Sequence, residues 1–208
     1  QMTQLQAAAS SGATLDKLLK AWGVQFDQNK VVADLVFQTR ITNRQGRPES
    51  APAILSITSE GVNTNDVVTS QIDSLLVPFA GSFSGTPATG LKETVLLRTT
   101  PQSETVEKFM AEFSGEQTIK DFVAGGKPLS VAIRLTGKFK TAFPDGKPKD
   151  NAAAKDEAGK DKTANNAPGL KESTRETAVV LVGDSDLLYD QFAAQVQEIF
   201  GQKIVYPR

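Results

Sequence analysis

The chain has 208 residues, of which 39% are hydrophobic and 23% are charged, a composition that is ordinary for a globular domain. Its 23 Lys and Arg against 24 Asp and Glu give a net charge of −1, which offers no broad attraction to nucleic acid or anionic lipid. The absence of cysteine and histidine excludes thiolate catalysis, disulfides and the commonest metal ligands. Only carboxylate chemistry remains, and we expect no metal and no cofactor.

The start of the chain, residues 1–13, is rich in Gln, Ala and Ser and is expected to be a frayed lead-in. Residues 14–208 are then predicted to form a single domain. No apolar run approaches the roughly 20 residues that a membrane-spanning helix needs. Because the sequence opens and closes without a cap or a tail, we interpret it as a fragment of a longer protein.

The first predicted element is a helix that Thr14 can cap and Gly23 ends, with leucines and Trp22 at helical spacing. Trp22 is expected in the core rather than as a ligand platform. Extended segments are predicted at residues 24–26, 31–41, 53–58 and 91–99. The glycine- and proline-rich stretch 78–90 is predicted to be a loop, which could touch a ligand but is more typical of a solvated connection.

The middle of the chain predicts one helix and one long strand. From Ser103 onward, apolar residues at i, i+3, i+4 and i+7 indicate an amphipathic helix: Val106, Phe109, Met110 and Phe113. Residues 129–143 alternate as the longest strand, with apolar residues on one face. Arg134, Lys138 and Lys140 lie on the other face, which could bind an anion, although a solvent-exposed face is the favoured interpretation.

The composition of residues 145–176 differs from that of the rest of the chain, because Lys, Asp, Ala, Asn and Gly dominate and acids alternate with bases. Such a low-complexity stretch cannot join a packed core. It is too long for a tight connection, so we predict a mobile surface insert within one domain. The strand that follows must then pair with earlier strands to bury its faces.

Residues 176–200 predict a strand, a turn and a helix in direct succession. The valine-rich run 177–182 is typical of a strand that is covered on both faces. After Gly183, three short polar residues stand where a helix must begin: Asp184, Ser185 and Asp186. Apolar residues then recur at helical spacing up to Phe200, and Gly201 follows where a C-terminal glycine is expected.

The acidic corner Asp184, Ser185 and Asp186 resembles two catalytic loops. A GDS-type serine hydrolase needs a histidine base, and this chain has none. Aspartate-nucleophile phosphatases hold magnesium with a second DxD loop upstream, which is absent here. Helix capping is therefore the favoured interpretation, with the three residues as a possible contact surface at the end of the strand.

Four stretches in order resemble the Gld-type auxiliary components of ABC transporters, a family named from bacterial gliding motility. They are LLKAWGVQFDQNKVVAD at residues 18–34, LLVPFAGSFSGTPATGLKETVLLRTTP at 75–101, LSVAIRLTGKFKTAFPDG at 129–146 and TAVVLVGDSDLLYDQF at 177–192. The resemblance spans most of the chain apart from the lead-in and the insert. None of the four stretches is an enzymatic signature.

The resemblance implies an α/β domain with a mixed, largely parallel sheet flanked by helices, distantly like the intraflagellar-transport and glutamine-amidotransferase-like folds. It also implies a periplasmic location at the inner membrane of a bacterial envelope, beside a permease and an ATPase, with membrane segments outside this fragment. The amidotransferases use a cysteine and a histidine, both missing here, so the fold does not carry the chemistry. No catalytic residue is carried over from the family.

Three functions follow as hypotheses. The first is a noncatalytic binding or scaffolding domain of an ABC transport system, without nucleic acid as a partner. The second is the binding of an envelope solute, a glycan or a peptide, in a cleft near Asp184–Asp186 and residues 78–90. The third is a hydrolase that uses the carboxylates of Asp184 and Asp186, with or without a divalent cation.

Overall fold

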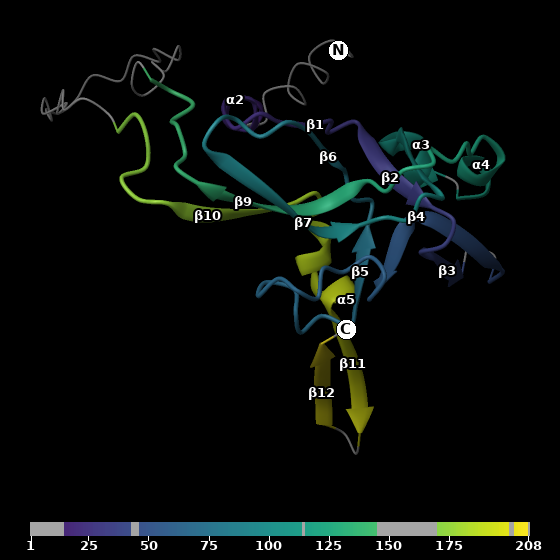
Figure 1. The fold of residues 1–208 in the computed structure, drawn as a ribbon. Coiled ribbons are helices and arrows are strands. Elements are labelled where there is room, and N and C mark those ends of the chain that lie inside the picture. The colour runs from purple at the N-terminus through teal and green to yellow at the C-terminus, as the bar shows by residue number, and fades with distance from the viewer. Residues whose placement is uncertain (1–14, 43–45, 114, 145–169, 200–201, 208) are drawn as a thin grey trace, which may run out of the picture.

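The computed structural model describes residues 15–42, 46–113, 115–144, 170–199 and 202–207, and strands dominate among them (Figure 1). The strands are β1 (Val24–Phe26), β2 (Lys30–Asp34), β3 (Gln38–Thr42), β4 (Pro48–Thr58), β5 (Ser74–Pro78), β6 (Phe83–Gly85), β7 (Leu91–Arg98), β8 (Ser103–Glu107), β9 (Ser130–Gly137), β10 (Thr177–Val182), β11 (Ala194–Ile199) and β12 (Gln202–Pro207). The helices are α2 (Asp16–Ala21), α3 (Lys108–Phe113), α4 (Gly115–Lys120), the 3-10 helix η1 (Asp186–Leu188) and α5 (Asp190–Ala193).

The predicted mixed, largely parallel α/β sheet is wrong, because every strand pair in the described residues is antiparallel. A parallel pair needs a crossover of a dozen or more residues, usually a helix. The described helices are instead four to six residues long, apart from a three-residue 3-10 turn. The chain therefore returns from strand to strand through turns and loops, which produces antiparallel sheets.

The largest sheet is built around β9, which has β10 on one edge and β7 on the other. Beyond the end of β10, β6 meets the first residue of β9 and continues the sheet to β1. A second sheet has the order β3-β4-β5, and β2 pairs with β8 in a third. The main core lies where these sheets meet, with Leu55, Ile57 and Val77 from the second sheet and Val131 from β9 fully buried.

Helix α2 covers one part of the β9 sheet, as its apolar spacing predicts. Leu19 and Trp22 pack with Ile133, Leu135 and Phe139 in a second apolar cluster. Trp22 is 8% exposed, and its ring meets that of Phe139 edge-on at 4.9 Å between centroids. Its indole N–H donates to the carbonyl of Lys140 at 3.2 Å. The predictions of this helix and of a core tryptophan are confirmed, whereas Thr14 lies outside the described residues and the N-cap position is Leu15.

Two predictions in the middle of the chain are confirmed only in part. Ser103 begins a strand, β8, and helix α3 starts only at Lys108. The backbone of β8 pairs along its whole length with β2, and this pairing overrides the local helical period. The strand predicted at 129–143 ends earlier, at Gly137, whose φ of +137° lies in a region that favours glycine. The longest strand is instead β4, with 11 residues.

The C-terminal region keeps its predicted strand but not its predicted helix. Among the described strands, β10 pairs with β9 alone, and Val180 and Val182 are 42% and 41% exposed, so the prediction of a strand covered on both faces is wrong. After the acidic corner, η1 and α5 are followed at once by the hairpin β11–β12. The β-branched residues Val196 and Ile199 favour a strand as much as the helical spacing favoured a helix. The predicted end at Gly201, the lead-in 1–13 and most of the insert, 145–169, lie outside the described residues.

Candidate functional site

A cleft of about 400 Å³ lies at the end of β10. It is formed by four stretches that are far apart in the sequence: the β1–β2 region, the loop after β5, the start of α3 and the acidic corner. Its lining residues are Phe26, Gln28, Lys30, Val31, Phe79, Gly81, Lys108, Val182, Gly183, Asp184, Ser185 and Asp186. The structure thus places the three predicted contact residues and part of the predicted loop 78–90 around one cleft.

Two glycines allow these segments to approach so closely. The N–H of Gly81 donates to the carbonyl of Gly183 at 2.8 Å, and the N–H of Gly183 donates to the carbonyl of Val131 at 2.9 Å. A Cβ atom at Gly183 would collide with the carbonyl oxygen of Gly81, and one at Gly81 would collide with the ring of Phe26. The cleft therefore has a backbone wall fixed by hydrogen bonds, which only glycine permits.

The carboxylate of Asp184 is incompletely paired. Its Oδ1 accepts the backbone N–H of Asp186 at 2.7 Å. Its Oδ2 is shielded from solvent and has no hydrogen-bond partner in the part of the chain that the structure describes. Burial raises the pKa of Asp184 to about 6, and the negative charge of Asp186 adds to the rise. The amides of Asp186 and Leu187 and the charge of Lys108 oppose that rise.

The predicted role of the corner as a helix cap loses its main support, because no long helix follows it. Ser185 occupies the N-cap position of the three-residue turn η1 and makes no side-chain cap hydrogen bond. The bond from the Asp186 N–H to Asp184 closes a local turn of the kind that Asp commonly forms. The corner is thus a turn that leaves one carboxylate oxygen unpaired beside a cleft.

Sequence reasoning missed two lysines of the cleft lining, Lys30 and Lys108, and included Phe79 only as part of the loop 78–90. Lys30 begins β2, and Lys108 begins α3, where its Nζ lies 3.7 Å from Glu112 Oε1. Phe79 has a φ of +52° and is the only non-glycine residue with positive φ in the described ranges. Its N–H donates to the carbonyl of Ala53 at 2.7 Å, which helps to hold this conformation. Such strain at a site wall is typical of binding or catalytic regions.

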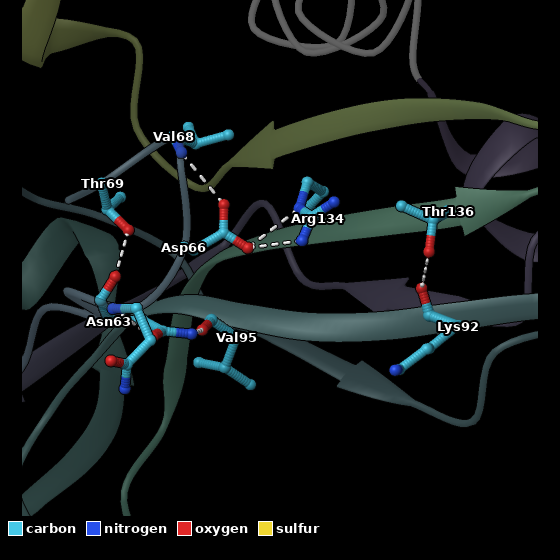
Figure 2. Close-up of polar contacts among 9 residues, drawn as sticks. Asn63, Asp66, Val68, Thr69, Lys92, Val95, Arg134 and Thr136 are labelled. Carbon is cyan, nitrogen blue, oxygen red and sulfur yellow. Dashed lines mark hydrogen bonds and ion pairs between the residues drawn. The ribbon is translucent and has the colours of Figure 1, made fainter.

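A second polar cluster lies on the β9 sheet and connects it to the turn that follows β4 (Figure 2). The Nε and Nη2 atoms of Arg134 donate to Asp66 Oδ2 at 3.0 and 2.5 Å, and the Val68 N–H donates to Oδ1 at 3.0 Å. The amide of Val68 lowers the pKa of Asp66 most, burial opposes this, and the Arg134 guanidinium lowers it further. The same turn is fastened to β7 by Asn63, whose Nδ2 donates to the carbonyl of Val95 at 3.0 Å.

This cluster corrects the interpretation of the basic row on β9. Lys138 and Lys140 are exposed as expected, but the side chain of Arg134 is only 26% exposed and is paired with a carboxylate that is 3% exposed. An arginine whose donors already serve Asp66 is not free to bind an anion. The row therefore contains one structural ion pair and two solvated lysines.

The described residues contain no group of three or more Asp and Glu side chains placed to hold a metal ion. At the cleft, Asp184 and Asp186 are the acidic residues, and one oxygen of Asp184 is already engaged by the backbone. The hydrolase hypothesis for these two carboxylates stays a prediction.

Comparison with known proteins gives one match. The model of a family described as an ABC-type uncharacterized transport system matches residues 1–207. The chain belongs to this ABC transporter auxiliary family. The resemblance drawn from four sequence stretches is thereby confirmed at the level of an ABC transporter auxiliary component. No curated protein and no solved structure matches the chain.

Membership of the ABC transporter auxiliary family makes the chain a component of a membrane transport system, with other transporter subunits as partners. Among the residues that the structure describes, no helix has the length and apolar character needed to cross a bilayer. The family match does not specify a role in gliding motility or the side of the membrane.

Proposed function

We propose that the chain is a noncatalytic binding or scaffolding domain of an auxiliary subunit in a Gld-type bacterial ABC system. It works on the periplasmic side of the inner membrane, beside a permease and an ATPase, with membrane segments outside this stretch. The family match over residues 1–207 carries the proposal. The lack of cysteine and histidine supports a noncatalytic role, because it removes the usual nucleophile and base pairs.

The exposed side of β10 supports a role in docking a partner. This strand has one edge without a partner strand in the described chain, and Val180 and Val182 expose about two fifths of their surface. Further along the chain, at the end of η1, Leu188 and Tyr189 are 76% and 62% exposed. An unprotected strand edge with apolar neighbours is a ready template for a strand of another protein. We expect the permease to occupy it, because the permease is the membrane partner of the domain.

The test is purification of the full-length parent protein from membranes with a mild detergent, followed by identification of bound subunits. We expect the permease and the ATPase to copurify, and Val180→Lys to reduce recovery of the permease because it places a charge on the docking strand. Val123→Lys is the matched control, since Val123 is 72% exposed and lies after α4, outside the β9 sheet. Recovery only of soluble cytoplasmic enzymes would contradict the proposal.

Binding of a small envelope solute in the cleft is the second candidate function. The specific observation that favours it is the shielded, unpaired Oδ2 of Asp184 beside a fixed backbone wall. A ligand that supplies a donor would remove the cost of that unpaired oxygen. A ligand at about one hundred times its dissociation constant should stabilise the fold by roughly 2.7 kcal/mol, which a thermal-shift measurement detects.

A further inference from the structure

The cleft at the end of β10 is lined by charges of both signs. Asp184 and Asp186 contribute two carboxylates, and Lys30 and Lys108 contribute two ammonium groups. The acids come from the corner after β10, and the lysines come from β2 and the start of α3. The formal charge of the lining is therefore zero, although its positive and negative groups come from different elements.

These opposite charges are not joined directly. Lys108 is near enough to lower the pKa of Asp184, but its Nζ is paired with Glu112. Among the ion pairs that the described residues form, none joins Lys30 or Lys108 to Asp184 or Asp186. Lys30 stands opposite Glu107 in the pairing of β2 with β8. A gap between separated charges can accept a ligand that carries the complementary pair.

The unpaired Oδ2 of Asp184 restricts which ligands fit the cleft. Since this oxygen is shielded and lacks a donor, the ligand must bring an N–H or O–H group to it. A cationic N–H is the strongest partner for an ionised carboxylate, with roughly twice the strength of a neutral hydrogen bond. A neutral sugar would satisfy the oxygen with a hydroxyl group but would make no use of the lysine charges across the cleft.

We propose that the cleft binds a small zwitterion, a free amino acid or short peptide, with its ammonium group on Asp184 and its carboxylate toward Lys30 and Lys108. This inference rests on solute binding, the second candidate function above. Phe26 and Phe79 supply apolar surface for a side chain of the ligand. Because hydrogen bonds between backbone groups fix Gly81 and Gly183, the cleft is preformed and binding pays little for ordering.

The test measures binding of the dipeptide L-alanyl-L-leucine to the full chain by calorimetry at pH 7.5. Its N-acetyl derivative, which lacks the ammonium group, is the matched probe, and maltose is the neutral sugar. We expect the free dipeptide to bind and the acetylated form to bind at least tenfold more weakly. Equal binding of the two dipeptides, binding of maltose alone, or no binding by any probe would overturn the inference.

Variants locate the site on the protein. Asp184→Asn should weaken the dipeptide at least tenfold, and Lys108→Gln should weaken it severalfold. Asp73→Asn and Lys92→Gln are the matched controls, since both residues are exposed and lie outside the cleft lining. A circular-dichroism melt of each variant separates loss of binding from loss of folding. If Asp184→Asn folds and binds like the unchanged protein, the ammonium site is not at Asp184.

The pH dependence is an independent readout that needs no substitution. With a pKa of about 6, the Asp184 carboxyl is mostly charged at pH 7 and mostly neutral at pH 5, while the ligand ammonium stays charged throughout. Affinity should therefore fall about tenfold from pH 7 to pH 5. An affinity that does not change over this range would overturn the inference. None of these failures touches the transporter role, which copurification tests separately.

Discussion

Asp66 and Asp184 are two shielded carboxylates near β9, and they differ in how completely they are paired. Asp66 receives the guanidinium of Arg134 and the amide of Val68, so both of its oxygens are engaged. Asp184 accepts the N–H of Asp186 on Oδ1, the Leu187 amide is near enough to lower its pKa, and Oδ2 is left without a hydrogen-bond donor. The pKa of Asp66 is lowered by its partners, whereas burial raises the pKa of Asp184 to about 6.

This contrast separates a structural carboxylate from a candidate functional one. A fully paired group holds a turn against a strand and stabilises the fold in its charged form. An unpaired group that is charged at neutral pH costs stability, and such costs concentrate at sites where a ligand later supplies the missing partner. Substitutions at and around the two carboxylates test the contrast, from the largest expected effect on stability to the smallest.

Arg134→Met should cause the largest loss, because it leaves Asp66 shielded and without its cationic partner. We expect the urea midpoint to fall further than for substitutions at Gly183 or Asp184. Lys92→Met on neighbouring β7 is the matched control, since Lys92 is exposed and its variant should stay within about 0.5 kcal/mol of the unchanged protein. A midpoint for Arg134→Met that equals the control would mean that the ion pair contributes nothing to folding.

Acid should reduce the difference between Arg134→Met and the unchanged protein. The pKa of Asp66 is lowered from 3.8 on folding, so its stabilising effect is present above pH 3.8 and is lost as pH falls through the lower folded value. Below that value the Asp66 carboxyl is neutral in both proteins, and the charged Arg134 of the unchanged protein has no negative partner. Urea titrations at pH 7 and at pH 3 measure the change.

The sequence predicts local features of the fold well where one signal acts alone. Helix α2 follows from its apolar stripe and Gly23, and β7 follows from the β-branched and aliphatic run at residues 94–97. The prediction of a C-terminal helix failed because Val196 and Ile199 satisfy both helical spacing and strand preference. Pairing of this segment with β12 favours the strand. The wrong fold class came from the family resemblance, which implied an α/β domain with a largely parallel sheet.

The candidate site could be predicted only in part. The corner Asp184–Asp186 was found because short polar residues after a strand are visible in a single stretch. Lys30 and Lys108 were missed because they reach the cleft from β2 and α3, and the approach depends on long-range backbone bonds at Gly81 and Gly183. The glycine-rich loop 78–90 was the one local sign that this region needed close backbone contacts.

Gly183→Ala should cause the next largest loss and should also alter the cleft. The added Cβ meets the carbonyl oxygen of Gly81, which is backbone and cannot swing away. Such overpacking costs about 1 to 3 kcal/mol. Gly125→Ala is the control, because a Cβ added at Gly125 would lie 3.2 Å from the Ser103 carbonyl oxygen and would require a smaller shift of its neighbour. Equal urea midpoints for the two variants would show that the Gly81 and Gly183 contact does not constrain the fold.

Asp184→Asn should have the smallest effect and the opposite sign, an increase in stability. The pKa of Asp184 rises from 3.8 to about 6 on folding. The contribution of this carboxyl to folding stability is therefore fully present below pH 3.8, where the group is protonated, and is lost as the pH rises through 6. The shift corresponds to about 3 kcal/mol, which solvent screening of this half-buried group reduces to about 1 to 2 kcal/mol. Asparagine is uncharged at every pH and keeps an oxygen for the Asp186 N–H.

The gain in stability from Asp184→Asn should therefore appear at pH 8 and disappear by about pH 4. The loss from Arg134→Met also shrinks in acid, so the two variants differ from the unchanged protein with opposite signs at high pH. Thermal melts of the full chain across this range, beside Asp73→Asn as the exposed control, measure both slopes. If Asp184→Asn instead destabilises the protein at pH 8, the carboxylate is paired in solution like that of Asp66. The cleft would then lack the unpaired acceptor on which ligand binding depends.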